Sequence, residues 1–211
     1  MAVALQRASA PFADSGYGFL VVGDIPALLD AVDQVMAEAP GIIGATTAVV
    51  VFVLAGLAFR SLLIPLRLLL TIGATMVFTA GAAVLTFQAG YLGAHDGIYW
   101  LLPIACGTMV VGITIDYDIF LVSRCYELRH LGYTTEAAIV RAMESQSATI
   151  TTAGVIMSIA FSSLLLSETA VLNEWGFILL SSCLYDTFIV RTLIVPSLLF
   201  CAVEANWWPG H

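Results

Sequence analysis

Apolar residues occur in five long runs, and short polar stretches separate these runs. A helix that crosses a bilayer needs about 20 mostly apolar residues. The pattern therefore predicts five membrane-spanning helices, at residues 42–59, 66–87, 98–122, 148–166 and 175–201. Prolines lie near the starts of the second and third runs, where a missing N–H group costs a helix least.

A different pattern precedes the first span. Between residues 24 and 39, apolar residues recur at helical spacing and acidic residues occupy the opposite side. We expect a short amphipathic helix here, ended by Pro40 and Gly41. The predicted fold is thus an all-α polytopic membrane protein in three parts. These are the end of an extracytoplasmic domain with the amphipathic helix (1–41), a five-helix transmembrane bundle (42–203) and a cytoplasmic tail (204–211).

Composition agrees with a membrane protein. Hydrophobic residues make up 60% of the chain and charged residues only 10%, and the mean hydropathy is +0.99. A soluble fold of this composition would expose large apolar patches. The net charge of -8 and the absence of lysine leave no basic surface for nucleic acid. The four cysteines have no paired spacing, so we expect neither disulfides nor a metal site, and no cofactor.

The arginines predict the orientation. Five of them lie in the loops after the first and third spans: Arg60, Arg67, Arg124, Arg129 and Arg141. The other two loops, 88–97 and 167–174, contain no lysine or arginine. The positive-inside rule then places the N-terminus outside and the C-terminus in the cytoplasm. We expect Trp207 and Trp208 at the inner membrane interface.

Two carboxylates interrupt the third apolar run, at Asp116 and Asp118. Ionisable groups inside a bilayer are costly and indicate function by default. Residues two apart on a helix point roughly 200° apart, so both cannot face one interior. We assign Asp116 to the bundle interior, because it shares a face with Gly112, and Asp118 to a second contact or the headgroup zone.

Tyr117 lies between these two aspartates. A low-dielectric medium favours the neutral form of a carboxylic acid, and a tyrosine hydroxyl can donate to the carboxylate or accept from the acid. An Asp-Tyr unit inside the membrane can therefore act as a proton switch, and the alternative is a polar clasp that fixes helix register. In the fifth span, Asp186 could pair with Arg191 or with a group on the third span.

The fourth span carries small and hydroxylated residues at helical spacing. They are Ser147, Thr151, Gly154, Ser158 and Ser162. Such residues let helices approach closely and form hydrogen bonds across the contact. We expect them to form a helix-packing face.

Several segments carry a resemblance to a known family. They are IDYDIFLVSR (115–124), LYDTFIVRTLIVPSLL (184–199), NWWP (206–209) and RSLLIPLRLLL (60–70). In combination they resemble the MMPL (mycobacterial membrane protein large) family over roughly residues 18–209. That family belongs to the RND (resistance–nodulation–division) superfamily of proton-driven exporters.

The resemblance implies that this chain is one part of a larger transporter. Such transporters have twelve spans in two halves, and this chain resembles spans eight to twelve. In the family an Asp-Tyr pair in span ten faces an equivalent pair in span four. Carried over, the proton relay is Asp116 and Tyr117, and Asp186 matches an acidic position in span twelve with at most a supporting role. We expect Arg191, which could pair with Asp186, to share that supporting role. The partners are then the bilayer, the missing N-terminal half and a lipid or other hydrophobic substrate, in the plasma or inner membrane.

Two other functions fit parts of the pattern. A non-transporting module that senses lipid or sterol, or acts as a scaffold, would use the small-residue face and not need Asp116. An intramembrane aspartyl protease would use two aspartates, and Tyr117-Asp118 and Tyr185-Asp186 resemble its motifs. Its Pro-Ala-Leu motif, however, occurs here at 26–28, ahead of both aspartates. We therefore expect a transporter and no enzyme.

Overall fold

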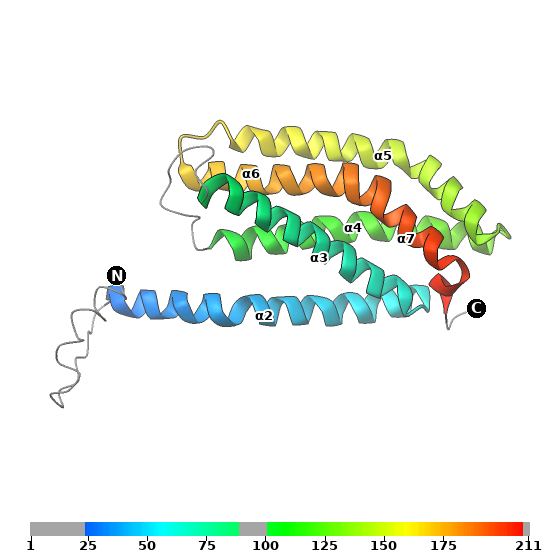
Figure 1. Cartoon of the computed structure of the whole chain (residues 1–211), viewed down its shortest axis with the longest axis horizontal. Helices are drawn as coiled ribbons and strands as arrows, with labels where there is room; N and C mark the ends of the chain where they lie inside the picture. Colours follow the sequence, from blue (N-terminus) through cyan, green and yellow to red (C-terminus); the bar gives the residue numbers. More distant parts are fainter. Residues whose placement is uncertain (1–23, 89–100, 209–211) are drawn as a thin grey trace, which may run out of the picture. The chain divides into compact units, whose positions relative to one another are not determined.

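The computed structural model describes residues 24–88 and 101–208, which are almost entirely helical. In chain order the elements are α2 (Asp24–Phe59), α3 (Leu63–Ala83), η2 (Val84–Gln88), α4 (Leu102–His130), α5 (Thr135–Leu164), α6 (Ala170–Tyr185), η3 (Asp186–Ile194), α7 (Val195–Ala202) and η4 (Val203–Trp207) (Figure 1). Within these residues, five helical stretches are long and apolar enough to cross a membrane. The predicted all-α fold with five spans is confirmed.

The helices extend beyond the apolar runs at one connection. The third span was expected to end at residue 122, but α4 continues to His130, and α5 begins at Thr135 instead of residue 148. Capping explains the early start of α5, since the hydroxyl of Thr134 accepts a hydrogen bond from the backbone N–H of Ala137 over 3.4 Å. Gly132 makes the turn with a φ of 93°, a conformation that favours glycine.

The predicted helix break at Pro40 and Gly41 is wrong. α2 runs from Asp24 to Phe59 with Pro40 inside it. Transmembrane helices tolerate proline because other groups can satisfy the freed backbone carbonyl. The chain forms two compact units, residues 1–39 and 40–211. The amphipathic, extracytoplasmic character of 24–39 and the domain ranges 1–41, 42–203 and 204–211 stay predictions.

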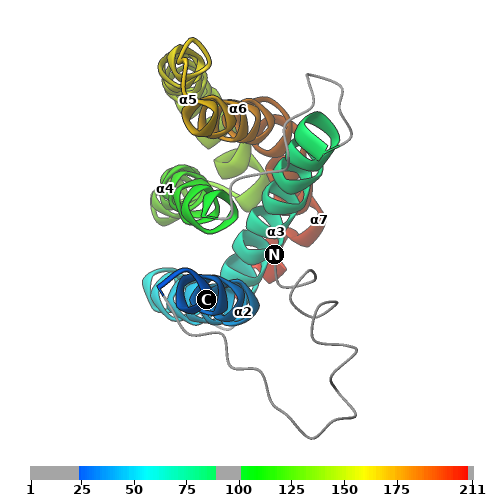
Figure 2. The same cartoon turned by 90° about the vertical axis from the view of Figure 1, so that its left-hand side faces the viewer.

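In the second unit, α6 contacts α3, α4 and α5. Figure 2 looks along the helices and shows α5 beside α6, with α3 and α4 completing the group. The hydroxyl of Ser61, which lies just before α3, accepts hydrogen bonds from the N–H groups of Leu63 and Ile64 in the first turn of that helix, at 3.2 and 3.3 Å. Pro103 occupies the first turn of α4, where its missing N–H group leaves no bond unmade.

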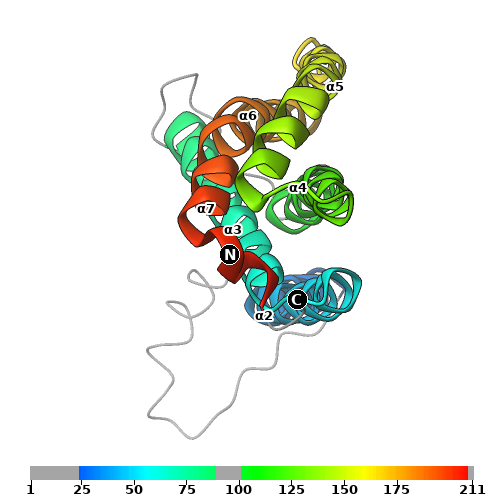
Figure 3. The ribbon, with the colours of Figure 1, turned by 90° about the vertical axis from the view of Figure 1, so that its right-hand side faces the viewer.

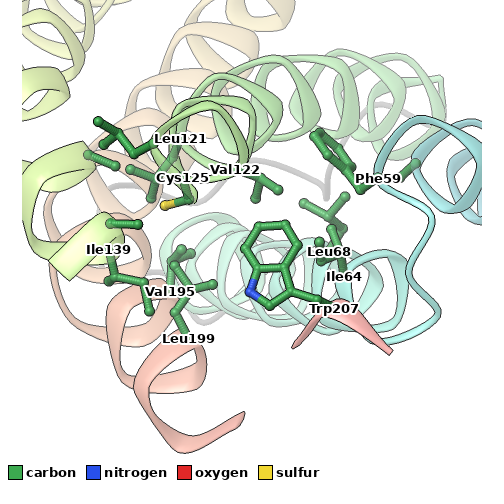
Figure 4. Close-up of a cluster of buried hydrophobic side chains, with 14 of the residues drawn as sticks. Phe59, Ile64, Leu68, Leu121, Val122, Cys125, Ile139, Val195, Leu199 and Trp207 are labelled. Atoms are coloured by element: carbon green, nitrogen blue, oxygen red, sulfur yellow. The ribbon is translucent and has the colours of Figure 1, made fainter. Parts of the chain in front are cut away.

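A buried apolar cluster closes one end of this bundle. Figure 4 shows the indole of Trp207 among Phe59, Ile64, Leu68 and Val122. Trp207 is 2% exposed, and its ring also lies 5.7 Å from the ring of Tyr126. The large apolar surface of Trp207 therefore packs inside the bundle, and its expected position at the inner membrane interface stays a prediction. Trp208 is 56% exposed.

Residues 204–208 lie at the end of the bundle that faces the viewer in Figure 3. They form contacts with the start of α3, the end of α4 and the start of α5. We call Glu204, Asn206, Trp207 and Trp208 the C-terminal clasp. The Ser61 hydroxyl donates to the Asn206 carbonyl, and the Leu62 N–H donates to the Trp208 carbonyl over 3.1 Å. Glu204 accepts from Thr135 over 2.7 Å and from Arg129 over 3.1 Å. Residues 204–208, expected as a tail, are thus part of the packed unit.

Candidate functional site

The two aspartates of α4 lie on opposite sides of the helix, as their spacing requires. Asp118 is 1% exposed, whereas Asp116 is exposed on the surface of the bundle. The assignment of Asp116 to the interior of this bundle is therefore wrong. α4 is apolar on most of its circumference, so the sequence pattern alone did not distinguish the two faces.

Asp118 lies between α3, α4 and η3. Its Oδ2 accepts a hydrogen bond from the hydroxyl of Thr71 over 3.0 Å. The positive charges of Arg67 on α3 and Arg191 in η3 act on this carboxylate, but among the described residues neither arginine forms a hydrogen bond or ion pair with it. Arg67 was expected in a loop, but it lies in the second turn of α3 and is 7% exposed. The second contact expected for Asp118 is thus a polar cluster inside the bundle.

Asp116 lies near the middle of α4. Among residues 24–88 and 101–208 its carboxylate has neither a hydrogen bond nor an ion pair. Its side of α4 is therefore one that the described part of this chain leaves uncovered. A carboxylate in such a position at membrane depth needs a polar partner or a proton to be stable.

Tyr117 reaches into a contact between helices. Its hydroxyl donates to the sulfur of Met157 on α5 over 3.1 Å. The guanidinium carbon of Arg191 lies 4.0 Å from the centroid of its ring. A cation over an aromatic face is attracted by the ring quadrupole, and the attraction grows when both groups are desolvated.

Arg191 is paired with Asp186. The Nε of Arg191 donates to Oδ2 of Asp186 over 3.0 Å, and one terminal nitrogen donates to the same oxygen. Both side chains are 3% exposed. Asp186 thus has Arg191 as its ion-pair partner, and it also interacts with Thr114 on α4, so both kinds of partner that the sequence left open are present.

The π-helical backbone of η3 makes this pair possible. In an α-helix, residues five apart point roughly 140° away from each other. In a π-helix the repeat is i to i+5, so Asp186 and Arg191 come to the same side. The hydroxyl of Thr192 donates to the carbonyl of Thr187, five residues earlier, over 3.2 Å. Such π-helical turns are frequent at functional sites.

The predicted packing face of α5 is in contact only in its middle. A Cβ added at Gly154 would lie 2.5 Å from side-chain atoms of Thr187 in η3, so this glycine is required for the approach. Ser158 lies 3.7 Å from the sulfur of Cys183 and is half-buried. Ser147 and Thr151 are exposed, and Ser162 is partly exposed.

Sequence reasoning missed three contributors to the site. Arg67 looked like a loop residue because it follows the apolar run of α2 by only a few residues. Thr71 and Met157 carry no signal in the sequence, because an ordinary threonine or methionine in an apolar helix is usually a packing residue. Among the described residues, no cluster of three or more His, Cys, Asp or Glu could hold a metal ion.

The sequence matches the model of the MMPL family over residues 2–211. The chain belongs to the MMPL family. It is 32% identical over 152 residues to the acyltrehalose exporter MmpL10 of Mycobacterium tuberculosis, covering 72% of this chain and 15% of that protein. It is 30% identical over 188 residues to the sulfolipid-1 exporter MmpL8 of the same organism, covering 89% of this chain and 17% of that protein.

These relationships confirm the resemblance and the membrane character of this MMPL protein. It is a multi-pass membrane protein with relatives that are named as lipid exporters and not as enzymes. The chain spans only about a sixth of the length of these relatives. The family match extends over both aspartates of α4 and over the Asp186–Arg191 pair.

Proposed function

We propose that this chain is the C-terminal transmembrane part of an exporter that is driven by the proton-motive force. Its cargo is a lipid or another hydrophobic molecule, and Asp116 and Tyr117 form its intramembrane proton relay. The observation that carries this proposal is the exposed carboxylate of Asp116 near the middle of α4. A second transmembrane half, packed over this side of α4, would supply the polar partner that the described residues do not.

The chemistry of the relay follows from the charge of the carboxyl group. With its proton, Asp116 is neutral and compatible with a low-dielectric surrounding, and without it the carboxylate attracts donors and cations. Protonation therefore changes how strongly α4 is held to the opposite half. The charged and the neutral form of Asp116 favour different arrangements of the two halves. Proton flow can therefore be coupled to movement of cargo.

Asp186 and Arg191 support this exchange at Tyr117. Arg191 lies over the ring of Tyr117 and keeps a positive charge beside the relay. The carboxylate of Asp186 compensates that charge. The π-helical turn holds both groups within the bundle, so the environment of Tyr117 is set before a proton arrives.

The remaining parts of the proposal concern partners and placement. The missing N-terminal half belongs either to the same longer chain or to a separate partner. The protein lies in the plasma or inner membrane with its N-terminus outside and its C-terminus in the cytoplasm. The positive-inside rule supports this orientation, because Arg129 pairs with Glu204 at the end of the bundle that holds the C-terminal clasp. We do not propose a catalysed reaction. Asp186, one of two aspartates that a protease would need, is neutralised by Arg191.

The test is gradient-driven lipid transport by the complete natural protein in proteoliposomes. Asp116→Asn keeps the shape of the side chain but cannot ionise, so we expect it to abolish the component of transport that depends on a proton gradient. Glu144→Gln, at an exposed acidic residue of α5, is the matched control and should transport normally. Full gradient-driven transport by Asp116→Asn would reject the relay, whereas no gradient-driven transport by the unaltered protein would favour the sensing or scaffold function.

A further inference from the structure

We propose that Arg60 and the groove beside it bind an anionic phospholipid of the surrounding bilayer. The phosphate lies at the guanidinium of Arg60, and an acyl chain lies along the last turns of α2. This lipid is a resident of the membrane and not the cargo. The inference therefore goes beyond the proposed function and does not depend on it.

The first support is the backbone of Arg60. α2 ends at Phe59, and Arg60 follows it with a φ of 48°. The residue directly after a helix often adopts this left-handed conformation, and it is usually glycine, because a Cβ makes the conformation costly. Residues held in such conformations are frequent where a protein clamps a ligand. An arginine in place of glycine therefore indicates that its side chain has a task.

The second support is the side chain of Arg60. It is exposed, and among residues 24–88 and 101–208 it forms neither a hydrogen bond nor an ion pair. The three arginines around the connection between α4 and α5 all have partners in the chain: Arg124 with Glu127, Arg129 with Glu204 and Arg141 with Tyr133. Arg60 thus differs from them in offering its charge to a group outside the described part of the chain.

The third support is the groove, which has a volume of about 630 Å³. Apolar residues of α2, among them Val53 and Leu57, form most of its wall, and Arg60 and Leu62 line it as well. Leu57 is 73% exposed and Leu62 is 44% exposed. Because Arg60 follows the last turn of α2, the apolar wall and the positive charge succeed each other along the helix. This order matches an acyl chain and an anionic headgroup.

The fourth support is Trp208, which lies next to the groove. The N–H group of Leu62 donates to the carbonyl of Trp208 over 3.1 Å, and Trp208 is 56% exposed. Exposed tryptophan side chains favour the level of the lipid headgroups. Trp208 therefore supports headgroup depth for this end of α2, where a phosphate can meet Arg60.

Charge selects the class of lipid. A guanidinium forms strong, bidentate hydrogen bonds with a phosphate, and basic groups beside membrane spans attract anionic headgroups. In phosphatidylcholine an ammonium group balances the phosphate, whereas phosphatidylglycerol has a net negative charge. None of the described residues that line the groove is acidic, so nothing there would hold the ammonium group. The groove therefore favours an anionic lipid.

The experiment uses phosphatidylglycerol with a photoactivatable diazirine on its acyl chain, in bilayers that contain the complete natural protein. Mass spectrometry then maps the labelled residues. We expect labelling within residues 52–62, and about tenfold less with the matching phosphatidylcholine probe, as the loss of one charge-assisted contact implies. Arg60→Gln should lower labelling by phosphatidylglycerol to the same extent. Arg141→Gln, at another exposed arginine, is the matched control and should be labelled normally.

Arg60→Gly separates lipid binding from folding. Glycine suits a φ of 48°, so this variant should melt at a higher temperature than the unaltered protein in lipid-free detergent. Its labelling by phosphatidylglycerol should nevertheless fall as in Arg60→Gln. A lower melting temperature would remove the first support and overturn the inference.

Two further results would overturn the inference. One is equal labelling of residues 52–62 by both lipid probes, which would make the groove an ordinary contact with the bilayer. The other is unchanged labelling by phosphatidylglycerol in Arg60→Gln or Arg60→Gly. These readouts need no transport, so they are independent of the result for Asp116→Asn, which tests the proposed function.

Discussion

Asp116 and Asp118 lie two residues apart in α4 and on opposite sides of the helix. Asp118 is 1% exposed and accepts a hydrogen bond from Thr71 over 3.0 Å. Asp116 is exposed on the surface of the bundle. The same short segment of an MMPL protein thus contains one carboxylate that joins α4 to α3 and one that is presented outward.

This division predicts different effects on stability. Asp118→Asn should lower the free energy of unfolding by about 1–3 kcal/mol, because it replaces the charged acceptor of the Thr71 hydroxyl inside the bundle. Asp116→Asn should change it by less than about 0.5 kcal/mol, as exposed substitutions do. Thermal unfolding of the purified variants in detergent measures both. Equal losses of stability would contradict the burial of Asp118.

The contact between α5 and η3 predicts a strict requirement for Gly154. Gly154→Ala should destabilise the bundle by about 1–3 kcal/mol, because the new Cβ would overlap the side chain of Thr187. Adding Thr187→Ala should recover part of the loss. Gly73→Ala is the matched control, since a Cβ there would meet nothing within 4 Å. Comparison of melting temperatures decides the matter, and a neutral Gly154→Ala would rule out the close approach.

The C-terminal clasp predicts unequal roles for two adjacent tryptophans. Trp207→Ala should cost about 3–5 kcal/mol, because it leaves a cavity in the cluster formed with α2, α3 and α4. Trp208→Ala should have little effect, since Trp208 is 56% exposed. The yield of folded protein in fluorescence-detected size-exclusion chromatography reports both variants. A larger loss with Trp208→Ala would reverse the assignment.

Arg191 combines two contacts that a lysine cannot reproduce. Its guanidinium donates through two nitrogens to Asp186 and lies over the ring of Tyr117. Arg191→Lys keeps the charge but loses the planar fork, so we expect transport to fall while the protein remains folded. Transport and thermal unfolding are measured on the same preparation. Normal transport by this variant would show that only the charge matters.

Much of the fold could be predicted from the apolar runs, because a span needs a long uninterrupted apolar stretch and five such stretches occur. The boundaries could not be predicted as well. Pro40 and Gly41 are strong breakers in soluble helices, yet α2 continues through Pro40. Tryptophan is a residue type typical of membrane interfaces, and only tertiary packing places the side chain of Trp207 in the core.

The site was predictable in its residues but not in its geometry. The spacing of Asp116 and Asp118 required opposite faces, and the structure confirms that requirement. Which face was interior depended on Thr71, Arg67 and η3, which lie far away in the sequence. The π-helical turn that aligns Asp186 with Arg191 has no recognisable local signal. The proton relay stays a proposal.

Infrared difference spectroscopy of the complete protein in membranes tests that proposal most directly. A change of pH across the range in which transport operates should produce a carboxyl C=O band from the protonated acid. The account predicts that this band disappears in Asp116→Asn and persists in the control Glu144→Gln. A band that persists unchanged in Asp116→Asn would show that another group carries the proton, and the relay assigned to Asp116 would be wrong.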